Sequence, residues 1–124
     1  MNPLGIPIFD LAERRLVWAA QRQGLLSQNI ANADTPGWRA RDVAPFAAQL
    51  NRAAAPLRTD PRHLLPRDPV GHAARRLGGE QAHNGNSVAL DVELSKVADT
   101  ESVHALSTGL FGKYVALFRT AAGR

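Results

Sequence analysis

Apolar side chains recur every seven positions over the first third of the chain. Two neighbouring rows carry this repeat: Leu11, Trp18 and Leu25, and beside them Ala12, Ala19 and Leu26. Seven residues complete nearly two turns of an α-helix, so each row lies along one side of the helix and can face a partner helix. The pattern predicts a single helix over residues 7–32 that packs through this stripe.

A second repeat of the same period occupies the last third of the chain. Its rows are Leu90, Val97, His104, Phe111 and Phe118; Val103, Leu110 and Leu117; and Ser107, Tyr114 and Ala121. They predict a helix over residues 88–122 whose C-terminal half is apolar over a wide arc, which is typical of burial on more than one side. Asn86 or Ser87 can cap this helix, and Asp91 and Glu93 suit the positive end of its dipole.

The segment between the two repeats has a different character. Prolines and glycines interrupt it: Pro45, Pro56, Pro61, Pro66, Pro69, Gly71, Gly78, Gly79 and Gly85. Residues 47–55 favour a short helix around Leu50, whereas residues 56–85 are typical of an irregular, arginine-rich loop.

We therefore expect an all-α fold in which long N- and C-terminal helices pair as a coiled-coil-like axial domain, with an irregular Pro/Gly/Arg-rich middle segment. The corresponding division of the chain is 1–42 for the N-terminal helix and its turn, 43–85 for the irregular region, and 86–124 for the C-terminal helix. A helix of about 35 residues spans about 52 Å, whereas a compact chain of this length has a radius of gyration of about 14 Å. The long helix should protrude, and other subunits should complete its burial.

The chain leaves the first predicted helix through the segment Asn29, Ile30, Ala31, Asn32, Ala33, Asp34, Thr35, Pro36, Gly37 and Trp38. Asn29 and Asn32 are three residues apart, so both amides can face the helix end, where backbone carbonyls lack partners. Pro36 ends the helix, and Gly37 after it permits the positive φ of a type II turn. Taken alone, such a segment is also typical of an ordinary helix terminus.

Composition excludes several classes of protein. The chain has 124 residues and no cysteine, so it is at most one domain and has no disulfide or thiolate site. No apolar run reaches the roughly 18 residues of a membrane span, and residues 1–7 lack the basic region of a secretory signal. The formal net charge is +4, but arginines are dispersed from Arg14 to Arg124 among acidic residues. Nucleic-acid binding, which needs clustered basic residues, is therefore not expected.

No group of residues has the spacing of a catalytic or metal site. His63, His72 and His83 fall in the irregular region without paired ligands on a helix. His104 lies on a heptad row, where it fits a packed or interfacial position better than the role of a base. The serines lack the context of a nucleophile elbow. We therefore expect no enzymatic activity, no metal and no cofactor.

The whole of segment 29–38 resembles the N-terminal signature of the flagellar axial proteins of bacteria, approximately N-I-A-N-x-x-T-x-G-aromatic. The continuation over residues 39–43 and Phe46 is similar to the proximal rod members rather than to hook or distal-rod members. Trp38 replaces the tyrosine that is usual there. Near the C-terminus, residues 85–88 and 110–120 match the G-N-x-V string and the closing helix of this family, although His104 stands where tyrosine is common. The middle of the chain resembles nothing specific.

This resemblance implies a structural subunit of the proximal rod of the flagellar basal body, in the periplasm, exported by the type III apparatus without a cleaved signal peptide. It implies helical assembly with other rod proteins, with copies of itself and with components of the MS ring and rod base, without a membrane span. Such a rod transmits torque and leaves an export channel.

Two sets of residues are expected to serve this assembly. The segment Asn29–Trp38 should fix a junction to a neighbouring subunit. Helix packing should involve Leu11, Trp18, Leu25, Leu90, Val97, Phe111, Tyr114 and Phe118. Two alternatives stay open: a sibling rod protein with a similar N-terminal segment, or a soluble two-helix coiled-coil interaction module unrelated to flagella.

Overall fold

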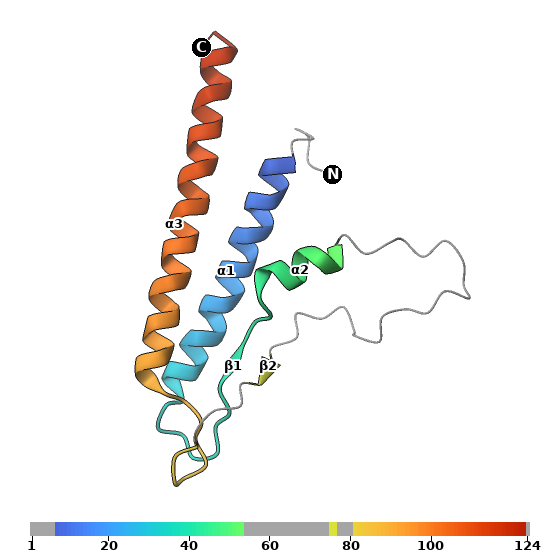
Figure 1. Cartoon of the computed structure of the whole chain (residues 1–124). Coiled ribbons are helices and arrows are strands. Elements are labelled where there is room, and N and C mark those ends of the chain that lie inside the picture. The colour runs from blue at the N-terminus through green and yellow to red at the C-terminus, as the bar shows by residue number, and fades with distance from the viewer. Residues whose placement is uncertain (1–6, 54–74, 77–80, 124) are drawn as a thin grey trace, which may run out of the picture.

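The computed structural model of the chain describes residues 7–53, 75–76 and 81–123. Its elements in chain order are α1 (Pro7–Ala31), β1 (Arg41–Asp42), α2 (Phe46–Ala53), β2 (Arg75–Arg76) and α3 (Leu90–Ala121) (Figure 1). The two long helices and the short one begin and end close to the predicted residues. The prediction of an all-α fold with two long terminal helices is confirmed.

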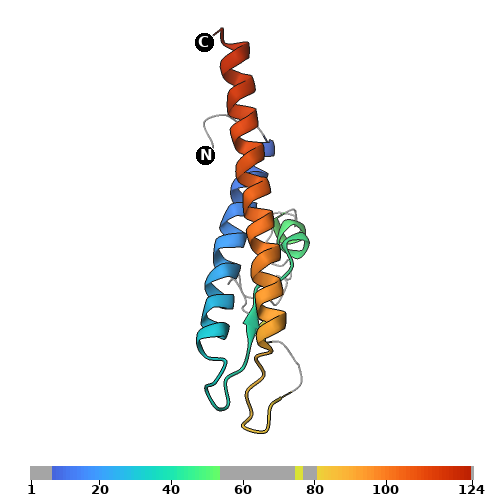
Figure 2. The same ribbon diagram turned by 90° about the vertical axis from the view of Figure 1, so that its left-hand side faces the viewer.

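The helices α1 and α3 lie side by side and run in opposite directions, as the two perpendicular views show (Figures 1 and 2). α1 begins and α3 ends at one end of the pair, and the turns lie at the other end. α3 has 32 residues and α1 has 25, which correspond to about 48 and about 38 Å. The C-terminal turns of α3 therefore extend beyond the start of α1, as the protruding helix predicted from the sequence requires.

A short antiparallel ladder joins β1 to β2, with Arg41 opposite Arg76 and Asp42 opposite Arg75. The sequence did not predict β2, which falls in the region expected to be irregular, because a two-residue strand has no periodic pattern. His63, His72 and the glycine pair at 78–79 lie outside the described residues.

The core gathers around Trp18 and Ala19 of α1. Val43 completes this buried cluster, and Leu25, Phe46 and Val103 pack against it. The Trp18 Nε1 group donates a hydrogen bond of 2.8 Å to the carbonyl oxygen of Ala44. The heptad row of α1 therefore contacts the chain that follows β1 as well as α3.

The side of α3 that is buried in the chain is polar. Glu93, Thr100 and Ser107, each seven residues apart, are its buried residues. The hydroxyls of Thr100 and Ser107 donate to backbone carbonyls one turn back, at 2.7 and 2.9 Å, so neither is left without a partner. Large apolar residues of the same helix remain exposed, among them Leu106 at 65% and Leu117 at 63%. The single chain thus does not bury the C-terminal half of α3 on several sides.

Candidate functional site

The segment Asn29–Trp38 forms a compact turn at the end of α1. The Asn32 side chain donates to the Gln28 carbonyl at 2.8 Å, and its Oδ1 accepts from the Thr35 hydroxyl at 3.1 Å. The Trp38 amide then donates to the Thr35 carbonyl, and Gly37 has a φ of +73°. A bond from position i+3 to i with positive φ at i+2 is the geometry of the expected type II turn.

The Asn29 side chain is buried and joins α1, which carries it, to β1 and to α3. Its amide nitrogen donates to the Arg41 carbonyl at 2.7 Å and to the Glu93 carboxylate at 2.8 Å. Its oxygen accepts from the Arg41 amide at 3.1 Å. The Asn29 amide therefore bonds β1 and α3, rather than the helix-end carbonyls expected from its spacing to Asn32.

Glu93 is a buried carboxylate, 2% exposed, and each of its two oxygens accepts a hydrogen bond. One oxygen accepts from Asn29 and the other accepts from the Lys96 ammonium at 2.7 Å. Because an unpaired buried charge is strongly destabilising, Glu93 requires both partners. This carboxylate fixes the first turn of α3 to the last turn of α1.

Asn86, in the segment that precedes α3, bonds the turn formed by the signature segment. Its amide nitrogen lies 3.0, 2.7 and 2.7 Å from the carbonyl oxygens of Asn32, Ala33 and Thr35. Its Oδ1 accepts from the Val88 amide at 2.7 Å. One buried side chain thus binds the carbonyls of the signature turn and orients the chain that enters α3.

Backbone contacts complete this arrangement. The Gly37 amide donates to the Asn84 carbonyl and the Ser87 amide to the Trp38 carbonyl, each at 3.0 Å. Gly85 has a φ of +79°, and a Cβ placed on it would lie 3.5 Å from the Gly37 Cα, so two glycine turns lie against each other. We name this unit, residues 29–41 with 84–93, the polar latch. Sequence reasoning found the residues of the latch but not their pairing.

The outer surface of the latch is exposed to solvent. Asp34, Thr35, Pro36 and Gly37 all lie on it, while the inward amides of Asn29 and Asn86 are fully engaged within the chain. Any contact of the signature segment with a neighbouring molecule therefore has to use this outer surface.

At the opposite end of α1, Phe9 is the centre of an aromatic cluster. It is 4% exposed, and its ring centroid lies 5.2 Å from that of Phe111 and 5.9 Å from those of Tyr114 and Phe118. The pairs with Phe111 and Tyr114 are edge-to-face, a geometry that adds to the stabilisation from area burial, and the Phe118 ring is tilted by 33°. Phe9 was missed from the sequence because it lies outside both heptad rows of α1.

The predicted helix-packing residues fall into two groups. Trp18 is buried, and Leu25, Val97 and Tyr114 are partly buried. Phe111 and Phe118 contact Phe9 but are each 45% exposed, while Leu11 is 39% and Leu90 48% exposed. The structure brings Phe111, Tyr114 and Phe118 together at one end of the helix pair, whereas Leu90 lies at the other end.

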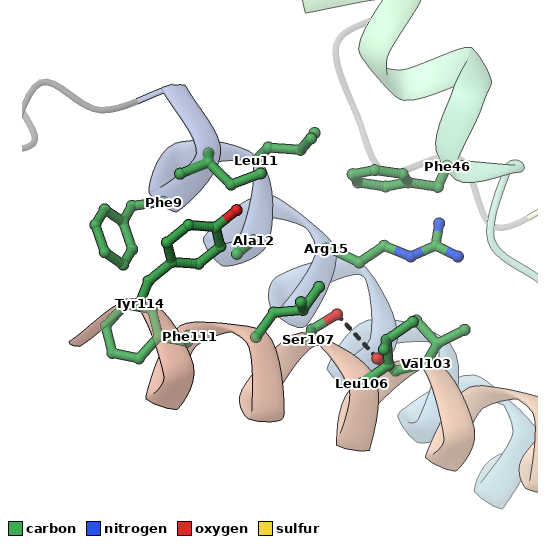
Figure 3. Close-up of a pocket in the computed structure, with 12 residues that line it drawn as sticks. Phe9, Leu11, Ala12, Arg15, Phe46, Val103, Leu106, Ser107, Phe111 and Tyr114 are labelled. Atoms are coloured by element: carbon green, nitrogen blue, oxygen red, sulfur yellow. Dashed lines mark hydrogen bonds between the residues drawn. The ribbon is translucent and has the colours of Figure 1, made fainter. Parts of the chain in front are cut away.

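An apolar groove runs between α1, α2 and α3 and has a volume of about 270 Å³ (Figure 3). Its walls are formed by Ile8, Phe9, Leu11, Ala12, Arg15, Phe46, Val103, Leu106, Ser107, Leu110, Phe111 and Tyr114. Arg15 extends along this groove toward Phe46, and its Cζ lies 4.5 Å from the Phe46 ring and 4.7 Å from the Trp18 ring. Burial, and then the charge of Arg22, lower the pKa of the Arg15 guanidinium.

Arg22, the neighbouring arginine, is paired within the chain. Its Nε and Nη2 donate to the two carboxylate oxygens of Asp42, each at 3.0 Å. This fork-to-fork geometry fixes β1 against α1. This ion pair neutralises the charge of Arg22, and both carboxylate oxygens of Asp42 take part in it.

The described part of the chain offers little support for metal binding, for a histidine in the core or for a membrane-spanning helix. Across residues 7–53, 75–76 and 81–123, no cluster of histidine, aspartate and glutamate could hold a metal ion. His83 and His104 are both exposed, so His104 is not a core residue of the single chain. None of the described helices combines the length and apolar character needed to cross a membrane.

Comparison with known proteins reveals clear relatives, although no family model matches the chain. The flagellar basal body rod protein FlgB of Agrobacterium fabrum is 32% identical over 118 residues, which cover 85% of this chain and 84% of that protein. FlgB of Salmonella typhimurium is 32% identical over 106 residues, which cover 75% and 76%. FlgB of Cereibacter sphaeroides is 35% identical over 111 residues, which cover 86% of each.

Proposed function

The chain belongs to the FlgB family of flagellar basal body rod proteins and is a structural subunit of that rod; from this premise we propose that it builds the proximal rod by helix packing rather than by catalysis. In this proposal it assembles helically with other rod proteins and with copies of itself, and its first neighbours include MS-ring and rod-base components. The assembly transmits torque and encloses the export channel.

One observation carries this proposal: α3 keeps its large apolar residues outside the chain's own core. Leu94, Leu106 and Leu117 are 52, 65 and 63% exposed, while the fully buried residues of α3 are all polar. Many large exposed apolar residues along one helix are what a protein–protein contact requires. A tube of identical or related subunits requires such surfaces, because heterologous contacts that do not close generate a helix.

The two residue sets act in different ways in this proposal. The outer surface of segment 29–38 provides the junction to a neighbouring subunit, while its inner amides hold the subunit's own helices. The helix-packing residues Leu11, Leu90, Val97, Phe111 and Phe118 complete their burial against adjacent subunits. The division into an axial helix with its turn (1–42), a middle region (43–85) and a closing helix (86–124) follows these roles.

The same proposal includes three further statements. The protein has no catalytic role, it lies in the periplasm, and it is exported by the type III apparatus without cleavage of a signal peptide. What supports a packing role is the engagement of Glu93, Asp42 and Arg22 in pairs that hold the fold. Such groups serve the architecture of the subunit.

A deletion strain tests the proposal. We expect cells without this protein to be non-motile and to lack complete rods in electron micrographs of basal bodies, and the unchanged gene to restore both. Intact rods in the deletion strain would contradict the proposed function.

A matched pair of variants links the result to the exposed surface. Leu117→Asp places a charge on a residue that the chain itself leaves 63% exposed, so the subunit should still fold but should not restore motility. Ser102→Asp places the same charge at an exposed polar position of the same helix and should restore motility. Equal complementation by the two variants would contradict a role for this apolar surface.

A further inference from the structure

The apolar groove contains a cation that the described part of the chain does not neutralise. Arg15 is the single charged residue among those described as lining it. Within the described residues, the ion pairs join Arg14 to Asp10, Arg22 to Asp42 and Lys96 to Glu93, and none involves Arg15. The groove therefore suits an apolar occupant that carries one carboxylate.

The N-terminal half of α3 has a surface of this chemistry. Leu90, Leu94 and Glu101 are spaced by four and seven residues, so they form one stripe along the helix. Leu90 and Leu94 are 48 and 52% exposed, and Glu101 is exposed as well. No described basic group pairs with Glu101.

The stripe and the groove lie on different sides of α3. Val103, which lines the groove, follows Glu101 by two residues, or about 200° around the helix. One copy can therefore offer its groove to a neighbour on one side and its stripe to a neighbour on the other. The two surfaces are also displaced along α3, since the stripe spans residues 90–101 and the α3 wall of the groove spans residues 103–114.

We propose that the groove of one copy binds the Leu90–Leu94–Glu101 stripe of a second copy, with the Glu101 carboxylate against the Arg15 guanidinium. This inference rests on the proposed rod function and names the contact that joins adjacent subunits. The displacement of 13 residues along α3, about 20 Å at 1.5 Å per residue, makes each contact a rotation combined with a translation. Repetition of such a contact builds an open helix rather than a closed ring.

Charge reversal in the full chain tests the pairing. Arg15→Glu and Glu101→Arg should each weaken self-association, measured by sedimentation equilibrium, about 100-fold, because each places like charges together at a desolvated contact. An equimolar mixture of the two variants should regain association, since the reversed groove of one fits the reversed stripe of the other. The double variant Arg15→Glu/Glu101→Arg should associate with itself for the same reason.

Arg14→Glu is the matched control, because Arg14 is the adjacent arginine but lies outside the groove and pairs with Asp10. It should associate as the unchanged chain does. Single reversals that associate normally, or a mixture no better than either variant alone, would overturn the inference. Loss of motility complementation with unaltered self-association would also overturn it, because the groove would then bind a different rod subunit.

Cross-linking tests the same contact in assembled rods. The chain has no cysteine, so Leu94→Cys combined with Leu110→Cys introduces the only thiols. The two sites lie about 24 Å apart along one helix at 1.5 Å per residue, so a disulfide between them must join two copies. Oxidation should yield covalent dimers and higher multimers, whereas Ser102→Cys with Leu110→Cys should yield none. Rods that contain the protein but show no such cross-links would overturn this contact and leave the proposed rod function standing.

Discussion

Asn29, at the end of α1, donates a 2.8 Å hydrogen bond to the carboxylate of Glu93 in the first turn of α3, across 64 positions of sequence. The same amide bonds the backbone of Arg41, so a single side chain ties together the two long helices and the strand between them. Asn29, the first asparagine of the signature segment, therefore stabilises the fold of the single subunit through bonds that need no neighbouring subunit.

The two asparagines of the signature segment should differ in importance. Asn29→Ala removes one of the two partners of the buried Glu93 carboxylate and the side-chain partner of the Arg41 backbone, and it should lower the free energy of unfolding by about 3 kcal/mol. Asn32→Ala, the matched control, removes bonds at the more exposed helix end and should lower it by about 1 kcal/mol. Urea unfolding followed by circular dichroism measures both. Equal losses would contradict the central position of Asn29.

Asn86 should be sensitive to the loss of its donor group alone. Asn86→Asp keeps the shape and the acceptor for the Val88 amide but turns an oxygen toward three carbonyl oxygens, so we expect a loss of about 3 kcal/mol. The neighbouring exposed Asn84 uses its Oδ1 as an acceptor, which Asn84→Asp retains. That control should change the unfolding free energy by about 0.5 kcal/mol or less. A harmless Asn86→Asp would contradict the latch.

Glycine-to-alanine changes should have opposite signs at two positions. Gly37 has a φ of +73°, where a Cβ is strained, so Gly37→Ala should destabilise the chain by about 1 kcal/mol. Gly24 lies within α1, and a Cβ added there would meet no atom within 4 Å beyond its chain neighbours and the adjoining backbone of its own helix, so Gly24→Ala should stabilise the chain by about 0.5–1 kcal/mol. Thermal unfolding followed by the helical circular dichroism signal separates the two. A shift in the same direction for both would refute this reasoning.

Phe9 should dominate the aromatic end of the helix pair. Phe9→Ala removes a buried ring that contacts three others and should lower the free energy of unfolding by about 3 kcal/mol. Val17→Ala, at a residue 49% exposed on the same helix, should change it by about 0.5 kcal/mol or less. Denaturant titration of the purified chain gives both values, and a Phe9→Ala loss as small as that of Val17→Ala would show that the cluster contributes little.

Much of this protein could be predicted from local pattern. The long helices were predicted because seven-residue spacing is a property of neighbouring residues on one helix. The turn was predicted because Pro36 and Gly37 restrict the backbone directly, and the Gly37 φ of +73° agrees. The family assignment followed from the signature segment and is confirmed by relatives 32–35% identical over most of the chain.

Pairing across long sequence separations was decided only by the tertiary structure. The sequence alone determined that α3 is a long helix rich in apolar residues, but apolar periodicity cannot say which side faces α1 and which is left for other molecules. The polar row Glu93, Thr100 and Ser107 faces inward because α1 supplies Asn29 to the carboxylate and the hydroxyls bond their own helix. The Glu93 carboxylate depends on Asn29, a partner 64 positions away in the chain, so its burial becomes possible only when the two helices have come together.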